Sequence, residues 1–388
     1  MLGLQIDRQM PGTMLAWLGQ PGLPDAIAPT PPVGHGVLRR MATDLLERLP
    51  GMGYPPVRAA YLERQVRALE TLLRINSGER LPFSEQAKLL LDIYPEKTPE
   101  SVLATARAEL EELLPGAEPL AMRFDRWQRT GAIPVTHLPM VLGQVFTEVR
   151  ARTLRHLSLP DEESIELRLG PDLPYSAYTR YLGSYRSRIE VNTRVPLHAA
   201  QLVDYCAHEA YPGHHTEHVL REEQQFRGRG QGEYAIQLSP TPAAVIWEAL
   251  ATTAPRLLFD RGEDTAWLAD EVLPRIGLRI EPERDAAIWA ARRVLDAAQG
   301  NAALLLHQEE RPSAEVAAYV ACWMLLAPGA AQRFVELLQG LPWRVYVFTY
   351  SHGPKLVSTL LEGADRFAAL RRLMTEPVYP ALLAPGSP

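Results

Sequence analysis

The residues with the clearest capacity for chemistry lie in one stretch, CAHEAYPGHHTEH, which covers residues 206–218. Five of the ten histidines fall between His198 and His218. A His-Glu pair followed within two helical turns by another His is typical of a hydrolytic zinc site, because neutral imidazoles bind the metal and the adjacent carboxylate takes a proton from metal-bound water. His208 and His214 are therefore the predicted Zn²⁺ ligands, and Glu209 is the predicted base.

The spacing departs from the common HExxH helix, in which the second His lies four residues after the first. Here that position is Pro212, which cannot bind a metal. Proline removes a backbone donor and Gly213 permits unusual backbone angles, so the pair favours a helix break that turns His214 back toward His208. His215 is the second choice, because an undistorted helix would put it about 10 Å along the axis from His208.

A second motif overlaps the first. Residues 214–218 match the inverted HxxEH arrangement, in which His214 and His218 would bind the metal and Glu217 would act as base. The first interpretation explains the Pro-Gly break, whereas the second gives it no purpose. We favour the first interpretation, in which Glu217 is an ordinary charge on a helix surface.

The third ligand is predicted on the next helix. In AAVIWEALATTA, Glu248 is the only charged residue among twelve. An unpaired buried carboxylate is costly, so Glu248 should have a partner, and a bound metal would supply one.

A family resemblance extends this interpretation. HEAYPGHH, the preceding RIEVNT, Glu248 and the later TYSHG together resemble bacterial domain-of-unknown-function family 885, which is similar to the glutamate-type zincin (gluzincin-like) metallopeptidases. The resemblance covers roughly residues 185–360. It implies the same ligands and the same base. Ala-Leu-Ala follows Glu248 where the family usually has Gly-Trp-Ala, a departure that concerns substrate preference and leaves the metal site intact.

A zincin also needs a donor for the oxyanion that forms at the attacked carbonyl. Tyr350 and His352 in VFTYSHGPK are the candidates, and we expect the Gly353-Pro354 pair to present them at a helix start. Asp204, one turn before His208, is a candidate to orient its ring, although a solvated position is the simpler expectation.

Substrate-binding candidates flank the motif. The strand Ser187–Asn192 could offer its edge to an extended peptide, with Asn192 bonding the substrate backbone, or it could simply pair within its sheet. Arg186, Arg180 and Lys355 could each bind a substrate carboxylate.

The surrounding pattern predicts a mainly α fold with a small antiparallel β-sheet beside the active-site cleft, a zincin-like α+β arrangement. Residues 1–35 are rich in Pro and Gly and should form an irregular segment that wraps the surface. Residues 36–160 show helical spacing and predict a lobe of four to six helices. Residues 161–388 combine strand-like IELRL and SRIEVN with further helices and form the predicted zincin-like catalytic region.

Composition narrows the function. The net charge of -6 argues against a nucleic-acid partner, which requires a basic face. The sequence lacks a basic start followed by an unbroken apolar stretch, so we expect a cytoplasmic protein that is not associated with a membrane. Cys206 and Cys322 are the only cysteines, and Cys206 should pack in the core.

We therefore predict a zinc-dependent metallopeptidase-type hydrolase acting on a peptide substrate. Two alternatives stay open. The protein could hydrolyse a small non-peptide amide, or it could be a zinc-stabilised scaffold or binding protein without turnover, although ligation alone would not need Glu209.

Overall fold

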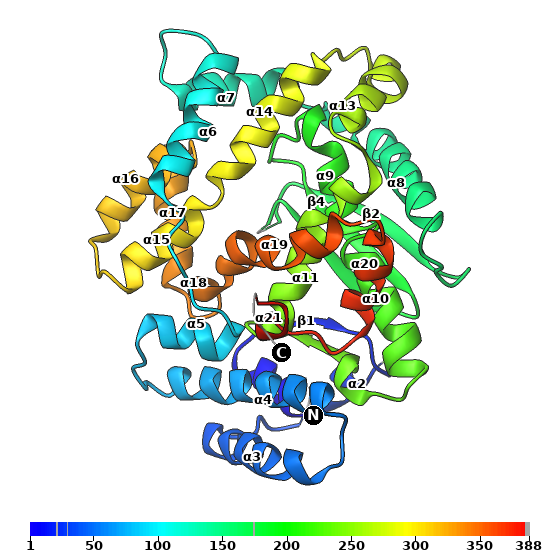
Figure 1. Cartoon of the computed structure of the whole chain (residues 1–388), viewed down its shortest axis with the longest axis vertical. Coiled ribbons are helices and arrows are strands. Elements are labelled where there is room, and N and C mark those ends of the chain that lie inside the picture. The colour runs from blue at the N-terminus through cyan, green and yellow to red at the C-terminus, as the bar shows by residue number, and fades with distance from the viewer. Residues whose placement is uncertain (21, 29, 174, 385–388) are drawn as a thin grey trace.

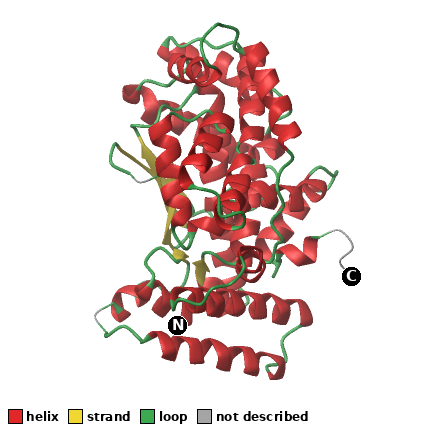
Figure 2. Ribbon diagram, turned by 90° about the vertical axis from the view of Figure 1, so that its left-hand side faces the viewer, coloured by secondary structure: helices red, strands yellow, loops and turns green. Residues whose placement is uncertain are grey.

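The computed structural model describes residues 1–384 except 21, 29 and 174. The predicted segment 1–35 therefore has two positions outside the described residues, 21 and 29, and the predicted region 161–388 has position 174 and residues 385–388 outside them. Helices dominate the described chain and two small sheets accompany them, which confirms the mainly α prediction. Figure 1 shows the sheet that contains β4 among the helices, and Figure 2 shows the strands along one face of the helical body.

The N-terminal residues differ from the irregular segment expected for 1–35. Two short helices and a strand form there: α1 (Leu2–Gln9), β1 (Met14–Trp17) and α2 (Leu23–Ile27). Leu4 and Ile6 on α1 are buried, and β1 pairs antiparallel with β5 (Ile236–Leu238). The frequent Pro and Gly keep these elements short, but buried apolar side chains such as Leu4 and Ile6 anchor the segment in the structure.

Residues 35–156 are all described and hold six α-helices, the upper end of the expected number. They are α3 (His35–Arg48), α4 (Pro56–Asn76), α5 (Phe83–Leu91), α6 (Glu100–Leu113), α7 (Leu120–Thr130) and α8 (Leu138–Leu154). A proline directly precedes the first residue of α5, α6 and α7. Proline suits this position because its fixed φ and missing N–H cost no helical hydrogen bond there.

The main sheet contains β2 (Ser164–Gly170), β3 (Ala177–Gly183) and β4 (Arg186–Asn192) in the order β2-β4-β3. β3 pairs antiparallel with β4, as predicted, but β2 pairs parallel with it, so the sheet is mixed. Ile189 and Val191 make β4 the most deeply buried of the three strands. The central position gives this strand backbone partners on both sides, which a buried backbone requires.

The remaining helices complete the chain. They are α9 (Leu202–Glu209), α10 (His214–Leu220), α11 (Pro242–Thr253), α12 (Pro255–Leu258), α13 (Glu263–Trp267), α14 (Pro282–Leu295), α15 (Ala298–His307), α16 (Ser313–Trp323), α17 (Pro328–Gln339), α18 (Trp343–Tyr346), α19 (Phe348–Leu361), α20 (Arg366–Thr375) and α21 (Pro380–Leu383). Within the described residues, no helix has the length and apolarity needed to cross a membrane.

Two buried clusters position the site. The largest contains Leu103 of α6 and Ile288 of α14, so helices before and after residue 160 share one core. A second cluster joins Val145 of α8 and Ile189 of β4 to Cys206 of α9. The burial of Cys206 confirms its predicted place in the core. Helix α9, which carries His208, is thereby fixed between α8 and the sheet.

Candidate metal centre

The predicted helix break is present. Helix α9 ends at Glu209 and α10 begins at His214. The chain between them turns so tightly that a Cβ on Gly213 would lie 2.0 Å from the His208 carbonyl oxygen, far inside contact distance. The Gly213 N–H instead donates to the Ala207 carbonyl over 2.9 Å. Only glycine fits here, and the turn sets His214 beside His208, with ring centroids 4.7 Å apart.

The three predicted ligands converge. Nε2 of His208 lies 3.8 Å from Oε2 of Glu248, and Nε2 of His214 lies 3.5 Å from Oε1 of the same carboxylate. One ligand atom from each residue lies within 4.8 Å of the other two. Four tetrahedral ligands about 2.1 Å from a zinc ion are about 3.4 Å from one another, so small adjustments would bring all three atoms to bonding distance.

The environment of Glu248 fits a bound cation. Its Oε1 accepts a hydrogen bond from the Tyr346 hydroxyl over 2.7 Å. Its Oε2 is buried and has no hydrogen-bond partner. A buried carboxylate oxygen without a partner is costly, and a metal ion would satisfy it. Two imidazoles and one carboxylate are also a donor set that zinc prefers, with one position left for water or substrate.

The two histidines are held in the form that binds metal. Burial lowers the pKa of His208 to about 4, and the neighbouring His214 lowers it further in the same sense. Burial likewise lowers the pKa of His214 to about 4, with His218 contributing. Both rings are therefore neutral near pH 7 and offer a nitrogen lone pair.

Glu209 lies next to this group and is buried. Burial raises its pKa to about 7, the Thr179 hydroxyl opposes the shift and the charge of Glu248 adds to it. The Thr179 hydroxyl lies 2.5 Å from Oε2 of Glu209 and 2.7 Å from its backbone oxygen. Strand β3 thus restrains the predicted base from outside its own helix.

The two candidate donors to the oxyanion, Tyr350 and His352, lie in different surroundings. Tyr350 lines the cleft that also exposes His208, and burial followed by the charges of Glu248 and Glu209 raises the pKa of its hydroxyl. It stays a protonated donor. His352 accepts from the Glu96 backbone N–H and contacts the Ser351 hydroxyl, so both ring nitrogens are engaged away from the cleft.

Their helix also differs from expectation. Pro354 lies inside α19, which begins at Phe348, so the Gly353-Pro354 pair starts no helix. Gly353 is instead a close contact with α11, where an added Cβ would lie 2.9 Å from the Val245 carbonyl oxygen. This approach brings Tyr350 near Glu248.

Among the described residues, the side chains of the inverted motif do not form a metal-binding group of their own. Nε2 of His218 contacts Oε1 of Gln237 over 2.8 Å, and the Gln237 amide donates to Oε2 of Glu217 over 2.6 Å. Glu217 also forms an ion pair with Arg221. The expectation that Glu217 is a surface charge is wrong, because its side chain is 2% exposed and belongs to this buried network.

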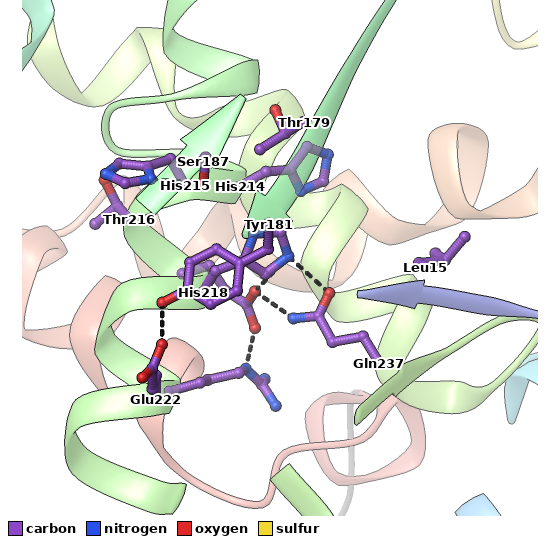
Figure 3. Close-up of polar contacts among 12 residues, drawn as sticks. Leu15, Thr179, Tyr181, Ser187, His214, His215, Thr216, His218, Glu222 and Gln237 are labelled. Atoms are coloured by element: carbon purple, nitrogen blue, oxygen red, sulfur yellow. Dashed lines mark hydrogen bonds and ion pairs between the residues drawn. The ribbon is translucent and has the colours of Figure 1, made fainter. Parts of the chain in front are cut away.

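His215 is occupied on the opposite side of α10. Its Nε2 contacts Oε2 of Glu163 and its Nδ1 contacts the Ser187 hydroxyl, both over 2.8 Å. Figure 3 shows His215 beside Ser187, with His214 turned the other way. His215 is fully buried and therefore supports the fold at this point, while His214 faces Glu248.

The cleft beside His208 has a volume of about 660 Å³. Asn192 lines it, but its amide already donates to the Leu173 carbonyl and accepts from the Arg194 N–H. Of the two possibilities for Ser187–Asn192, the structure shows pairing within the sheet and no free edge, because β4 is the central strand. Arg186 lies at the other end of β4 and is not among the described residues that line the cleft.

The other charged candidates are engaged elsewhere. Arg180 pairs with Glu190, and Lys355 is exposed outside the described lining of the cleft. Asp204 neither orients His208 through a hydrogen bond in the described structure nor stands free in solvent. It accepts from Trp289 Nε1 and from Arg293, each over 2.6 Å.

Comparison with known proteins informs the fold alone. No family model and no curated protein matches the chain. Among solved structures, a candidate lipoprotein from Colwellia psychrerythraea is similar, with a TM-score of 0.53, 13% identity and coverage of 96% of this chain. The chain spans 56% of that protein. A candidate lipoprotein of unknown function from Shewanella oneidensis gives a TM-score of 0.48 at 12% identity, with 88% of this chain and 73% of that protein covered. Membership of family 885 stays a prediction.

Two residues of the site were missed from the sequence. Tyr346 contacts Glu248 across 98 positions and Thr179 contacts Glu209 across 30. A usable signal exists for Tyr346, since it precedes Tyr350 by four residues, the spacing that puts two side chains on one helical face. Thr179 gives no comparable signal, because threonine is common in strands.

Proposed function

We propose that this chain is a zinc-dependent hydrolase of peptide bonds, with His208, His214 and Glu248 as the protein ligands and Glu209 as the general base. The observation that carries the proposal has two parts: one ligand atom from each of these three residues lies within 4.8 Å of the other two, and Oε2 of Glu248 is buried without a hydrogen-bond partner.

Hydrolysis is favoured over simple metal storage by what surrounds the ligands. Glu209 is adjacent to His208, buried, and aligned by a hydroxyl, although it is not one of the three converging residues. His208 also lines a cleft of about 660 Å³, a size suited to several residues of a bound peptide. A purely structural zinc site is usually closed by four protein ligands and has no cleft.

Each residue then has a defined task. A zinc ion bound here would supply Lewis acidity and lower the pKa of a coordinated water to about 7. Glu209 accepts a proton from the attacking water and delivers it to the leaving amine nitrogen. The Tyr350 hydroxyl donates to the carbonyl oxygen as negative charge develops there. Tyr346 donates to Oε1 of Glu248 and holds the carboxylate in place, which leaves Oε2 without a protein hydrogen bond and open to a cation.

The test measures metal and turnover together. Protein purified without chelator should contain about one zinc per chain, and it should release products from a peptide mixture. Chelation should abolish release and added zinc should restore it. Protein that neither contains nor binds zinc would overturn the proposal. Bound zinc without turnover would favour a scaffold, and cleavage of small amides alone would identify a different substrate class.

A further inference from the structure

The charges that face the cleft are paired with one another. Among the described residues that line it, the groups ionised near pH 7 are two arginines and two aspartates. Arg293 donates to Asp204 over 2.6 Å and Arg292 donates to Asp296 over 2.6 Å. The Arg292 guanidinium also lies 5.7 Å from the ring centroid of Phe124. No described lining residue is left with an unmatched charge for a substrate.

The rest of the lining is largely apolar. Phe124 of α7, Trp289 of α14, Leu326 between α16 and α17, and Val195 contribute large side chains from four separate segments. Each of these side chains is at least partly exposed. Apolar surface that stays accessible around a few polar groups is typical of a ligand site, since covering it with an apolar group is favourable.

This apolar wall is tied directly to the metal-ligand helix. Trp289 Nε1 donates to Asp204 over 2.6 Å, and Asp204 precedes His208 by four residues on α9. Residues four apart on a helix are neighbours, with Cβ atoms about 5–6 Å apart. An extended peptide advances about 3.3–3.6 Å per residue. Trp289 is thus joined to the helix that carries His208 and lines the same cleft, so a peptide bound at His208 would extend past it.

We propose that the cleft selects a neutral, bulky apolar side chain on a substrate residue near the cleaved bond. This inference rests on the proposed hydrolase function and narrows it to a substrate class. A leucine or phenylalanine side chain would cover Trp289 and Leu326. A charged side chain would lose water without gaining an unpaired partner, because both arginines and both aspartates are already engaged.

Binding and turnover test the inference separately. Zinc-loaded Glu209→Gln protein is titrated calorimetrically with short peptides blocked at both ends that differ only in one residue: Phe, Leu, Asp or Lys. The apolar peptides should bind about ten- to a hundredfold more tightly than the charged ones. Wild-type protein should show the same order in kcat/KM. Equal binding of all four peptides, or preference for a charged one, would overturn the inference.

The two proposals fail in different ways. Cleavage of all four peptides at equal rates would overturn the apolar selection while leaving the hydrolase function intact. Apolar preference in binding, with no cleavage of any peptide by the zinc-loaded wild type, would support the selection and overturn the hydrolase.

A charge introduced into the wall provides a second test. Leu326 lies in the connection between α16 and α17 and is only partly buried. Leu326→Asp should shift preference toward the Lys peptide, and Leu326→Lys should shift it toward the Asp peptide, each by about tenfold. Thermal unfolding checks that both variants fold, and the peptide titration of the Glu209→Gln protein tests the inference if either does not. Two folded variants with the wild-type order of preference would overturn the role assigned to this wall.

Discussion

The hydroxyl of Thr179 lies 2.5 Å from Oε2 of Glu209, and both side chains are buried. One hydroxyl hydrogen serves two acceptors here, because the backbone oxygen of Glu209 is also within 2.7 Å. Thr179 belongs to β3, whereas Glu209 ends α9. The sheet therefore restrains the orientation of the predicted base.

Two substitutions of Thr179 test the roles of its hydroxyl and its methyl group separately. Thr179→Val keeps the shape and removes the hydrogen bond, so kcat should fall about tenfold at unchanged zinc content, since a hydrogen bond to a carboxylate contributes about 1.5–3 kcal/mol. Thr179→Ser keeps the hydroxyl and should retain most activity. Steady-state kinetics at matched zinc occupancy would measure both. Greater loss in the serine variant would show that packing of the methyl group matters instead.

Substitution of Tyr346 should affect metal binding, whereas substitution of Tyr350 should affect catalysis. Tyr346→Phe removes the donor to Oε1 of Glu248 and should weaken zinc binding about tenfold or more, as loss of a hydrogen bond to a metal ligand does. Tyr350→Phe should keep zinc affinity and lower kcat about a hundredfold. Competition with a chelating dye gives the affinities. A loss of affinity in the Tyr350 variant alone would reverse these roles.

The local motif was the part of the site best read from the sequence. His208, Pro212, Gly213 and His214 lie within seven positions, so backbone geometry alone links them. Glu248 was predicted from the cost of an unpaired charge in an apolar helix, and the structure brings its carboxylate to both histidines.

Relationships set by tertiary packing were not readable in this way. Asn192 was expected at a strand edge, but the parallel addition of β2 covers β4 on that side. Glu217 was expected on a surface because a charge usually is solvated, yet every residue of α10 except His214 is buried and a partner cation, Arg221, follows one turn later. The helical content was predictable from periodicity, whereas the strand order required knowledge of which strand the core would cover.

Adjacent histidines on α10 should respond differently to substitution. His214→Ala should lower zinc affinity steeply and leave the fold intact, because this ring faces Glu248 and makes no hydrogen bond in the described structure. His215→Ala should keep most zinc affinity but lower the melting temperature, since it removes one buried hydrogen bond from Glu163 and one from Ser187. Metal titration and thermal unfolding of both variants provide the comparison. Loss of zinc in the His215 variant at full stability would make His215 the ligand.

Acid should destabilise the protein through Glu163. Burial opposes ionisation of this carboxyl, but hydrogen bonds from His215, Tyr211 and Arg150 outweigh it and lower the pKa from 4.5 to about 2. A pKa that is lower in the folded state gives stability above pH 4.5 that is lost as pH falls toward 2. This contribution is about 2 kcal/mol.

Urea unfolding at pH 6 and pH 3 measures the contribution of Glu163 to the free energy of unfolding. Glu163→Gln should unfold more easily at pH 6 and lose less stability on acidification than the wild type. Glu47→Gln, at an exposed position on α3, should keep the wild-type acid dependence. An unchanged acid dependence in the Glu163 variant would place the sensitive group elsewhere.

The two glutamates that flank the helix break should fail for different reasons. Glu209→Gln removes the predicted base but no ligand, so zinc and fold should persist while kcat falls about a hundredfold or more. Glu217→Gln leaves Arg221 buried without its counter-charge, in a pocket where the guanidinium also lies near the side chains of Tyr61, Tyr234 and Trp247. Breaking a buried ion pair costs about 3–5 kcal/mol, so this variant should unfold at lower urea.

Turnover and unfolding must be measured together to separate these outcomes. At matched zinc occupancy, the folded fraction of the Glu217 variant should hydrolyse peptides at near the wild-type rate, because the Glu217 carboxylate is already bonded to Gln237 and Arg221. The Glu209 variant should show wild-type urea dependence and little turnover. If Glu217→Gln abolished turnover without a stability change and Glu209→Gln remained active, the inverted motif would hold the chemistry, and both the base and the ligands would need to be reassigned to residues 214–218.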